Sequence, residues 1–164
     1  MNYLTSLMLL PLLGAILVST LQKNKSNYAK WVALLTSIVV ALLGLLIALR
    51  FEIDRPGFQF VENYSWIPSF GINYSLGIDG IALVLILMSV ILVPIVIVAG
   101  WHESEGGRWS PKVFYSLLLV LETMMIGVFA STDVFLFYVF FEAMLVPVYF
   151  LIGGYGSGER AAAA

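Results

Sequence analysis

The sequence from Asp133 to Ile152, DVFLFYVFFEAMLVPVYFLI, constrains the fold more than any other part of the chain. This run of about 20 residues would measure about 30 Å as a helix, which is the thickness of the hydrocarbon core of a bilayer. Glu142 lies near its midpoint, where an ionisable group is costly and usually functional. The run therefore predicts a membrane-spanning helix with a proton-handling acid; the alternative is a protonated glutamate that only packs between helices.

The residues around Glu142 support the proton-handling interpretation. Tyr138 precedes it by four positions and Tyr149 follows it by seven, so helical spacing places all three side chains on one face. Pro147 has no N–H group to bond the carbonyl of Ala143. That free acceptor is a natural anchor for a water molecule or a partner side chain.

The composition is that of an integral membrane protein. The chain is 61% hydrophobic and 11% charged, with a mean hydropathy of +1.00, whereas about a quarter of a soluble domain is charged. The absence of cysteine excludes disulfides, cysteine-bound zinc and iron–sulfur clusters on these residues. The single histidine, His102, argues against haem held between helices, and the lack of a basic cluster argues against nucleic-acid binding. The first apolar run lacks a positive leader, so we expect a retained helix rather than a signal peptide.

Four further apolar runs complete the predicted fold class, an all-α integral membrane protein with five transmembrane helices. The expected helices cover residues 3–21, 31–50, 80–100, 112–130 and 133–152. Because the link Ser131-Thr132 is so short, the last two helices must be antiparallel neighbours. Residues 51–79 alternate in polarity near 58–60 and again near 71–74, which predicts a short β-hairpin on the outer surface.

Lysine and arginine side chains indicate the orientation in the membrane, because they are enriched in cytoplasmic loops. If all five helices span, one side of the membrane carries Lys23, Lys25, Lys30, Arg108, Lys112 and Arg160. The other side carries the N-terminus, the 131–132 link and the segment 51–79, in which acids outnumber Arg55. The N-terminus is therefore predicted outside and the C-terminus on the cytoplasmic side.

A second acid, Glu122, lies near the middle of the fourth expected helix. Glu122 and Glu142 are at similar distances from the 131–132 link, so they should lie at similar depth. If their faces meet, they could share a proton, since two close carboxylates resist ionising together. If their faces point apart, Glu122 would be protonated or bonded to a polar group on another helix. Sequence does not fix helix rotation, so both arrangements stay open.

The other polar residues have simpler explanations. Asp79 precedes the third helix, where an aspartate caps free N–H groups; direct proton handling is the alternative. His102, Glu103 and Glu105 could be metal ligands, but in a glycine-containing loop they are more typical of solvated surface. Arg108 and Lys112 are interpreted as topological anchors. Nucleotide-binding and nucleophile-elbow motifs are absent from the sequence.

Two runs resemble a known family. FLFYVFFEAMLVPVYFLIGGYG is similar to the fifth helix of the antiporter-like membrane subunits of proton-pumping NADH:quinone oxidoreductase, respiratory complex I. WIPSFGINYSLGIDGIALVLILMSVILVPIVIVAGW resembles the approach to the third helix in the subunit M (subunit 4) group of that family. The spacing of the runs fits the family, and the resemblance covers nearly the whole chain. Subunits of Mrp-type cation/proton antiporters share the glutamate helix and are the alternative.

The resemblance implies a function for Glu142. In the family, this glutamate pairs with a lysine on a later helix and helps to move protons along a central polar axis. We would then expect a proton-translocating subunit that couples quinone reduction to proton transport. FMN, iron–sulfur clusters and quinone would be held by partner subunits, with no cofactor on this chain. Expected partners are other membrane-arm subunits, including neighbouring antiporter-like subunits, and lipid, in a bacterial plasma membrane.

The resemblance also implies that more protein follows. Family members have about fourteen helices, with two inverted five-helix repeats that enclose half-channels. The sequence ends after the fifth helix, before the helix expected to bring the lysine. Residues 1–112 would hold the first three helices, and residues 113–164 the first part of a proton-channel repeat. We therefore expect an N-terminal portion of a longer subunit.

Overall fold

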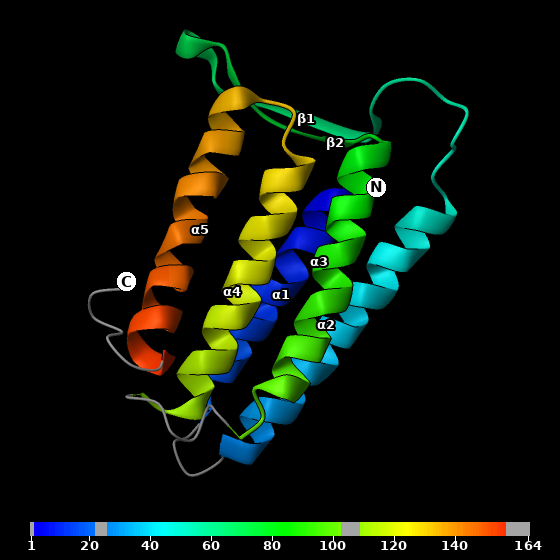
Figure 1. The fold of residues 1–164 in the computed structure, drawn as a ribbon. Coiled ribbons are helices and arrows are strands. Elements are labelled where there is room, and N and C mark those ends of the chain that lie inside the picture. Colours follow the sequence, from blue (N-terminus) through cyan, green and yellow to red (C-terminus); the bar gives the residue numbers. More distant parts are fainter. Residues whose placement is uncertain (1, 22–25, 103–108, 157–164) are drawn as a thin grey trace.

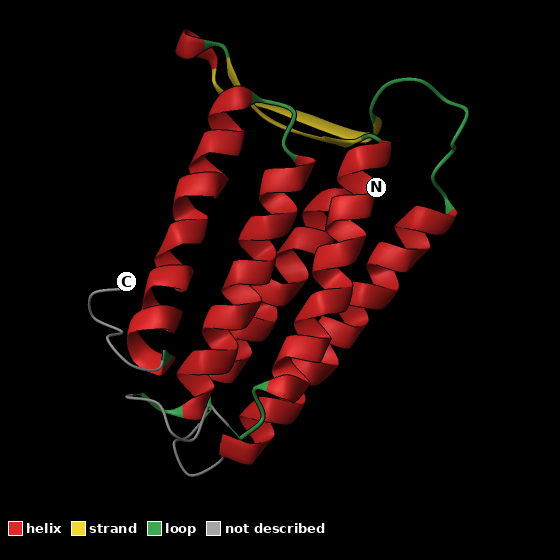
Figure 2. Cartoon of the chain, in the orientation of Figure 1, coloured by secondary structure: helices red, strands yellow, loops and turns green. Residues whose placement is uncertain are grey.

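The computed structural model describes residues 2–21, 26–102 and 109–156 of the chain. It consists of five long helices and one β-hairpin (Figures 1 and 2). The helices are α1 (Tyr3–Thr20), α2 (Ser26–Leu49), α3 (Gly80–Ala99), α4 (Pro111–Ala130) and α5 (Val134–Tyr155). All five are long and apolar enough to cross a membrane, which confirms the predicted fold class.

The helices run side by side, and the hairpin lies across one end of the bundle (Figure 2). We call this the hairpin end; the opposite end, where α1 ends and α4 begins, is the loop end. Helix α4 is central and packs against α1, α2, α3 and α5. Helix α5 stands at one edge of the bundle, where it packs against α4 and strand β2 (Ile72–Ile78) (Figure 1).

The interior consists of two apolar clusters stacked along the bundle. The cluster near the hairpin end includes Leu7, Leu76 and Ile126, and the cluster near the loop end includes Val18, Ile97 and Leu119. Between helices in a bilayer, close van der Waals packing replaces the hydrophobic effect as the main attraction, so small residues mark the tightest contacts. One such contact joins α1 to α2, where a Cβ atom at Gly14 would collide with the Thr36 side chain.

The hairpin is built from two antiparallel strands, β1 (Gln59–Ile67) and β2. Tyr64 lies opposite Tyr74, and a short 3-10 turn, η2 (Pro68–Phe70), joins the strands. The turn closes at Gly71, whose φ of 67° is unfavourable for residues with a Cβ atom. Both strands are longer than the sequence predicted. The prediction for β1 was too short because polar and apolar residues do not alternate cleanly along this strand.

The hairpin is bonded to the helix ends beneath it. The buried Glu62 carboxylate of β1 accepts hydrogen bonds from the α1 backbone, from Leu4 N at 2.8 Å and from Thr5 N at 3.2 Å, and also from the Thr5 hydroxyl. These N–H groups belong to the first turn of α1, which has no intrahelical acceptor for them. Glu62 therefore caps α1 from a distant part of the chain.

Strand β2 is joined in the same way to the link between α4 and α5. The Thr132 N–H donates to the Ser75 carbonyl at 2.9 Å, and the two side-chain hydroxyls lie 2.7 Å apart. Leu76 and Ser131 form an isolated antiparallel bridge. The link thus behaves as a short third strand and holds the ends of α4 and α5 against the hairpin.

Helix α2 departs most from the sequence expectation, since it begins at Ser26 rather than near residue 31. Lys30, expected in a loop, lies within the helix and is only 2% exposed. Its ammonium group donates to the Trp101 carbonyl at 2.8 Å and lies 5.5 Å from the Trp101 ring centroid. The Trp101 carbonyl and ring satisfy the buried ammonium group, so this lysine does not end the helix.

The division of the chain at residue 112 stays a prediction. Helix α4 packs against α1, α2 and α3 as well as α5. The two apolar clusters that contain α4 residues also contain residues of the helices around it. The described residues therefore form one packed bundle. The boundary at residue 112 marks where the five-helix repeat expected from the resemblance would begin. It does not divide the apolar core of the bundle.

We expect Glu62→Ala to lower the free energy of unfolding by about 1–3 kcal/mol, because it leaves the α1 N–H groups without their buried acceptor. The measurement is the thermal unfolding of the purified protein in detergent, followed by circular dichroism. Asp54→Ala removes an exposed acid from the connection between α2 and β1 and is the matched control. Equal transition midpoints for the two variants would contradict the capping role.

Candidate functional site

Helix α5, which carries Glu142, is fixed at its start by Asp133. The Asp133 carboxylate accepts hydrogen bonds from Phe135 N at 2.9 Å and from Leu136 N at 3.1 Å, as an N-cap residue does. It also accepts from Asn73 N of β2 at 3.2 Å. The hydrogen bond from the Leu136 backbone, and next that from Asn73, hold the pKa of Asp133 below its ordinary value. Asp133 thus sets the position of α5 relative to the hairpin.

Glu142 lies on the exposed side of α5. Tyr138 lies one turn earlier and its hydroxyl interacts electrostatically with the Glu142 carboxylate, in agreement with the shared face that the sequence predicted. Tyr138 is 56% exposed and Tyr149 is 54% exposed. Because the described residues that pack against α5 belong mainly to α4, to strand β2 and to Trp109 before α4, this face of the helix is open to whatever surrounds the described chain.

Glu122 has the opposite surroundings. Its side chain is 0% exposed, and within the described residues neither carboxylate oxygen has a hydrogen-bond partner. Leu118, Leu119 and Ile126 occupy the neighbouring turns on the same face of α4, and they belong to the apolar clusters shared with α1, α2 and α3. An unpaired carboxylate in such a place is costly as an ion. Glu122 is therefore the main buried polar group whose partner the described residues do not supply.

The two glutamates do not face each other. The side of α4 that meets α5 is marked by Gly127, where a Cβ atom would lie 2.7 Å from the Phe140 ring. Five residues of helix separate Gly127 from Glu122, which turns their side chains about 140° apart. Glu122 points into the bundle while Glu142 points out of it, so the structure does not bring together the shared-proton pair that the sequence left open.

Two prolines place free backbone carbonyls near the depth of Glu122. The Ser116 hydroxyl donates to the Ala15 carbonyl at 3.2 Å, which fixes the antiparallel register of α4 and α1. Six residues closer to the hairpin end, Glu122 of α4 lies level with residue 9 of α1, within about one turn of the Leu7 carbonyl freed by Pro11. On α3, Pro94 frees the carbonyl of Val90 in the same way. Both carbonyls come from buried residues, and either could accept the O–H of a neutral carboxyl group, directly or through water.

The structure shows Asp79 at the start of α3. Its carboxylate accepts from Ala82 N at 2.8 Å and begins α3, which confirms the predicted cap. Lys112 donates to the Ser19 and Leu21 carbonyls, both at 3.2 Å, so this anchor also closes the end of α1. His102 follows α3, but its predicted loop neighbours Glu103, Glu105 and Arg108 lie outside the described residues. So do Lys23, Lys25 and Arg160.

Sequence reasoning missed Glu62, which it counted only as an acid of the outer segment. A residue 58 positions from the backbone group it caps leaves no local signal. Asp133 was recognised only as the start of an apolar run, although an aspartate before such a run is a signal for an N-cap. Its bond to Asn73, 60 positions away, could not have been read from the sequence.

Comparison with known proteins gives close relatives. NADH-quinone oxidoreductase subunit M of Mycobacterium tuberculosis is 38% identical over 182 residues, which cover 95% of this chain and 33% of the relative. The chain belongs to the subunit M (chain 4) family. F(420)H(2) dehydrogenase subunit M of Methanosarcina mazei is 39% identical over 155 residues, which cover 94% of this chain and 30% of the relative. No protein-family model matches the chain.

The fold agrees with this family. A chain of respiratory complex I from Thermus thermophilus, in a structure with bound NADH, superposes with a TM-score of 0.78 and 27% identity. The match covers 99% of this chain and 31% of that chain. The chain therefore spans about a third of the length of the subunit M relatives it matches. Together with the five membrane-length helices, the match identifies an integral membrane protein.

The lowered pKa of Asp133 predicts the pH dependence of its contribution to stability. Because the folded-state pKa lies below the unfolded value of about 4, the stabilisation is fully present above pH 4 and is lost as the pH falls through the folded-state pKa. We expect Asp133→Asn to lower the thermal midpoint at neutral pH, and the difference from the unmodified protein to shrink on acidification. Thermal unfolding measured from pH 7 to pH 3 tests this. A difference that stays constant over that range would contradict it.

Proposed function

We propose that this chain forms part of a proton-translocating membrane-arm subunit of a complex I-type oxidoreductase, which couples quinone reduction to proton transport. The similarity to subunit M relatives supports the assignment to such a complex. The observation that carries the proposal is Glu142, an ionisable residue near the middle of a membrane-length helix, on a face that no other described helix covers. Such a residue is costly unless it is used.

The chemistry proposed for Glu142 is the loading and unloading of a proton. Dry surroundings favour its neutral form, and a nearby cation favours the charged form. Movement of a cation toward or away from Glu142 would therefore release or capture a proton. The Tyr138 hydroxyl can stabilise the carboxylate, and the Ala143 carbonyl freed by Pro147 can hold a water molecule beside it. The cation, expected to be a lysine of a later helix, would come from residues beyond this chain.

Glu122 is proposed as a second proton-holding group, separate from the first. It lies on the α1 and α3 side of α4, with free carbonyls of these helices near its depth. This arrangement supports a relay through the interior of the bundle rather than proton sharing with Glu142. Its connection to Glu142 would have to pass around α4, through residues or water that other parts of the assembly supply.

Electron transfer is assigned to partner subunits. The chain contains no cysteine for an iron–sulfur cluster, and we propose that FMN, iron–sulfur clusters and quinone are held elsewhere in the complex. The relatives carry names with different electron donors, NADH in one and F(420)H(2) in another. This variation supports a role for subunit M that is independent of the donor. Neighbouring membrane-arm subunits, antiporter-like subunits among them, are the proposed partners.

The proposed orientation places the hairpin end and the N-terminus outside the membrane. Lys30 and Lys112 both lie at the loop end, and the sequence adds Lys23, Lys25, Arg108 and Arg160 to the same side. An excess of lysine and arginine marks the cytoplasmic side. The similarity to a relative from Mycobacterium tuberculosis supports a bacterial plasma membrane.

An Mrp-type cation/proton antiporter would use the same glutamate, and the two functions differ in what drives transport. The antiporter would exchange cations in membranes that receive no electron donor, whereas the proposed subunit would move protons only during quinone reduction. The relatives reported above are named as oxidoreductase and dehydrogenase subunits, which favours the second. Co-purification with oxidoreductase subunits rather than Mrp subunits would separate the two directly.

We expect Glu142→Gln to reduce proton pumping at least about tenfold, because the amide cannot carry the proton. The measurement is donor-driven quenching of a pH-sensitive dye in membrane vesicles that contain the assembled complex. Glu52→Gln, which neutralises an exposed acid beside the hairpin, is the matched control and should pump normally. Normal pumping by a fully assembled Glu142→Gln complex would reject the proposed role.

We expect the effects of Glu122→Gln and of the milder Glu142→Asp substitution to be additive in free energy, since the two side chains point to different sides of α4. The pumping rate of the double variant, relative to the unmodified complex, should then equal the product of the two single-variant fractions. Initial rates from the same vesicle assay give all three values. A double variant no slower than the slower single variant would instead show that the two acids work as one unit.

A further inference from the structure

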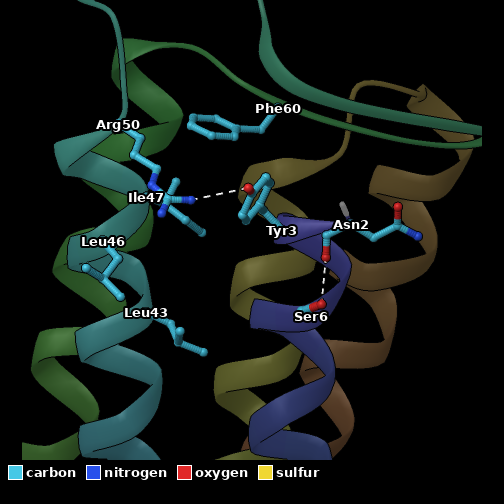
Figure 3. Close-up of a pocket in the computed structure, with 8 residues that line it drawn as sticks. All are labelled: Asn2, Tyr3, Ser6, Leu43, Leu46, Ile47, Arg50 and Phe60. Atoms are coloured by element: carbon cyan, nitrogen blue, oxygen red, sulfur yellow. Dashed lines mark hydrogen bonds between the residues drawn. The ribbon is translucent and has the colours of Figure 1, made fainter.

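A cavity of about 320 Å³ lies between α1 and α2 at the hairpin end of the bundle (Figure 3). Leu43, Leu46 and Ile47 of α2 form its apolar wall, and Tyr3, Arg50 and Phe60 surround its mouth. This volume is within the range of pockets that hold small ligands. No acidic side chain of the described residues lines it. The cavity takes no part in the proposed proton chemistry, which lies on α4 and α5.

The cavity has the shape of a wedge because α1 and α2 pack together toward the loop end and separate toward the hairpin end. Gly14 makes a tight contact with Thr36, and toward the hairpin end α2 leans away from the other helices (Figure 1). From Leu43 to Arg50, the α2 wall of the cavity rises about 10 Å. That is about two thirds of one leaflet of the 30 Å hydrocarbon core, so the wedge lies within one leaflet, with its mouth at the level of the lipid headgroups.

The mouth of the wedge carries an ordered positive charge. The Arg50 guanidinium donates to the Tyr3 hydroxyl at 3.2 Å and lies 5.7 Å from the Tyr3 ring centroid. The Phe60 ring packs edge-on against Tyr3, with ring centroids 5.7 Å apart. Phe60 reaches this place with a φ of 53°, a conformation that bulky residues rarely adopt. Arg50 has five N–H donors, and its contacts within the described residues use only one hydrogen bond, to Tyr3.

We propose that this wedge binds one anionic phospholipid from the leaflet on the hairpin side. The phosphate group sits on the Arg50 fork beside the Tyr3 hydroxyl, and an acyl chain lies along Leu43, Leu46 and Ile47. An arginine fork matches the geometry of phosphate oxygens, and a headgroup at this level leaves its charge in contact with water. A protein segment would instead have to bury the charge of Arg50, for which the cavity offers no acid.

The test uses the full-length protein in its native assembly, placed in lipid nanodiscs that contain a photoreactive phosphatidylglycerol. The reactive diazirine lies midway along one acyl chain, and a phosphatidylcholine with the same label serves as the zwitterionic comparison. After irradiation, mass spectrometry of the α1 and α2 peptides locates the label. We expect labelling of the wedge residues by phosphatidylglycerol and clearly weaker labelling by phosphatidylcholine.

Two variants separate the headgroup contact from the chain contact. Arg50→Gln should lower phosphatidylglycerol labelling in the wedge about tenfold, as expected for the loss of a charge-assisted contact. Arg55→Gln removes an exposed charge from the same end of the molecule without touching the cavity, and should leave the labelling unchanged. Leu46→Trp fills the wedge while keeping Arg50, and should also lower the labelling; Leu46 is 52% exposed, so the larger side chain can be accommodated.

Three results would overturn the proposal. Absence of label from the wedge of the unmodified assembly would show that another protein segment fills it. Equal labelling by the two lipids, or equal losses in Arg50→Gln and Arg55→Gln, would show that no specific headgroup site exists. Unchanged labelling in an assembled Leu46→Trp complex would show that the acyl chain lies elsewhere. Native gels of each variant establish assembly, and Leu46→Trp carries the test if Arg50→Gln does not assemble.

Discussion

The backbone groups at the helix ends determine how this bundle is held together. Lipid chains offer no hydrogen bonds, so peptide groups left unpaired against them are costly, and every helix begins with N–H groups that have no intrahelical acceptor. The hairpin end meets this need with three carboxylates: Glu62 caps α1, Asp79 caps α3 and Asp133 caps α5. Two of these caps also join separate segments of the chain, so satisfying the helix ends fixes the hairpin across the bundle.

This capping also determines where the proton-handling groups lie. Asp133 ties the start of α5 to β2, and Glu142 follows nine residues later, about 14 Å along the helix. That distance is close to half of the hydrocarbon core, so a carboxylate outside the membrane sets the depth of one inside it. The central position of α4 has the complementary effect, because it buries Glu122 against α1 and α3 while α5 keeps an open face.

The sequence predicted what depends on hydropathy and on neighbouring residues, and failed where distant contacts decide. Apolar runs located all five helices, and the position of Asp79 before one of them identified its cap. Helix rotation depends on packing, so the separation of Glu122 from Glu142 could not be derived. The same limit hid the partner of Glu62, and Lys30 was taken for a loop residue because its burial depends on contacts with distant residues such as Trp101.

Three places that the described residues leave incomplete require different kinds of partner. The open face around Glu142 is wide and rich in aromatic side chains, with Tyr138 and Tyr149 more than half exposed, which suits the packing of further helices. Glu122 is enclosed on all sides, so only a proton or a small molecule such as water can complete it. The wedge beside Arg50 is apolar below and charged at its mouth, which is the polarity of a phospholipid. Size and polarity thus distinguish the three places, and a single kind of partner could not satisfy them all.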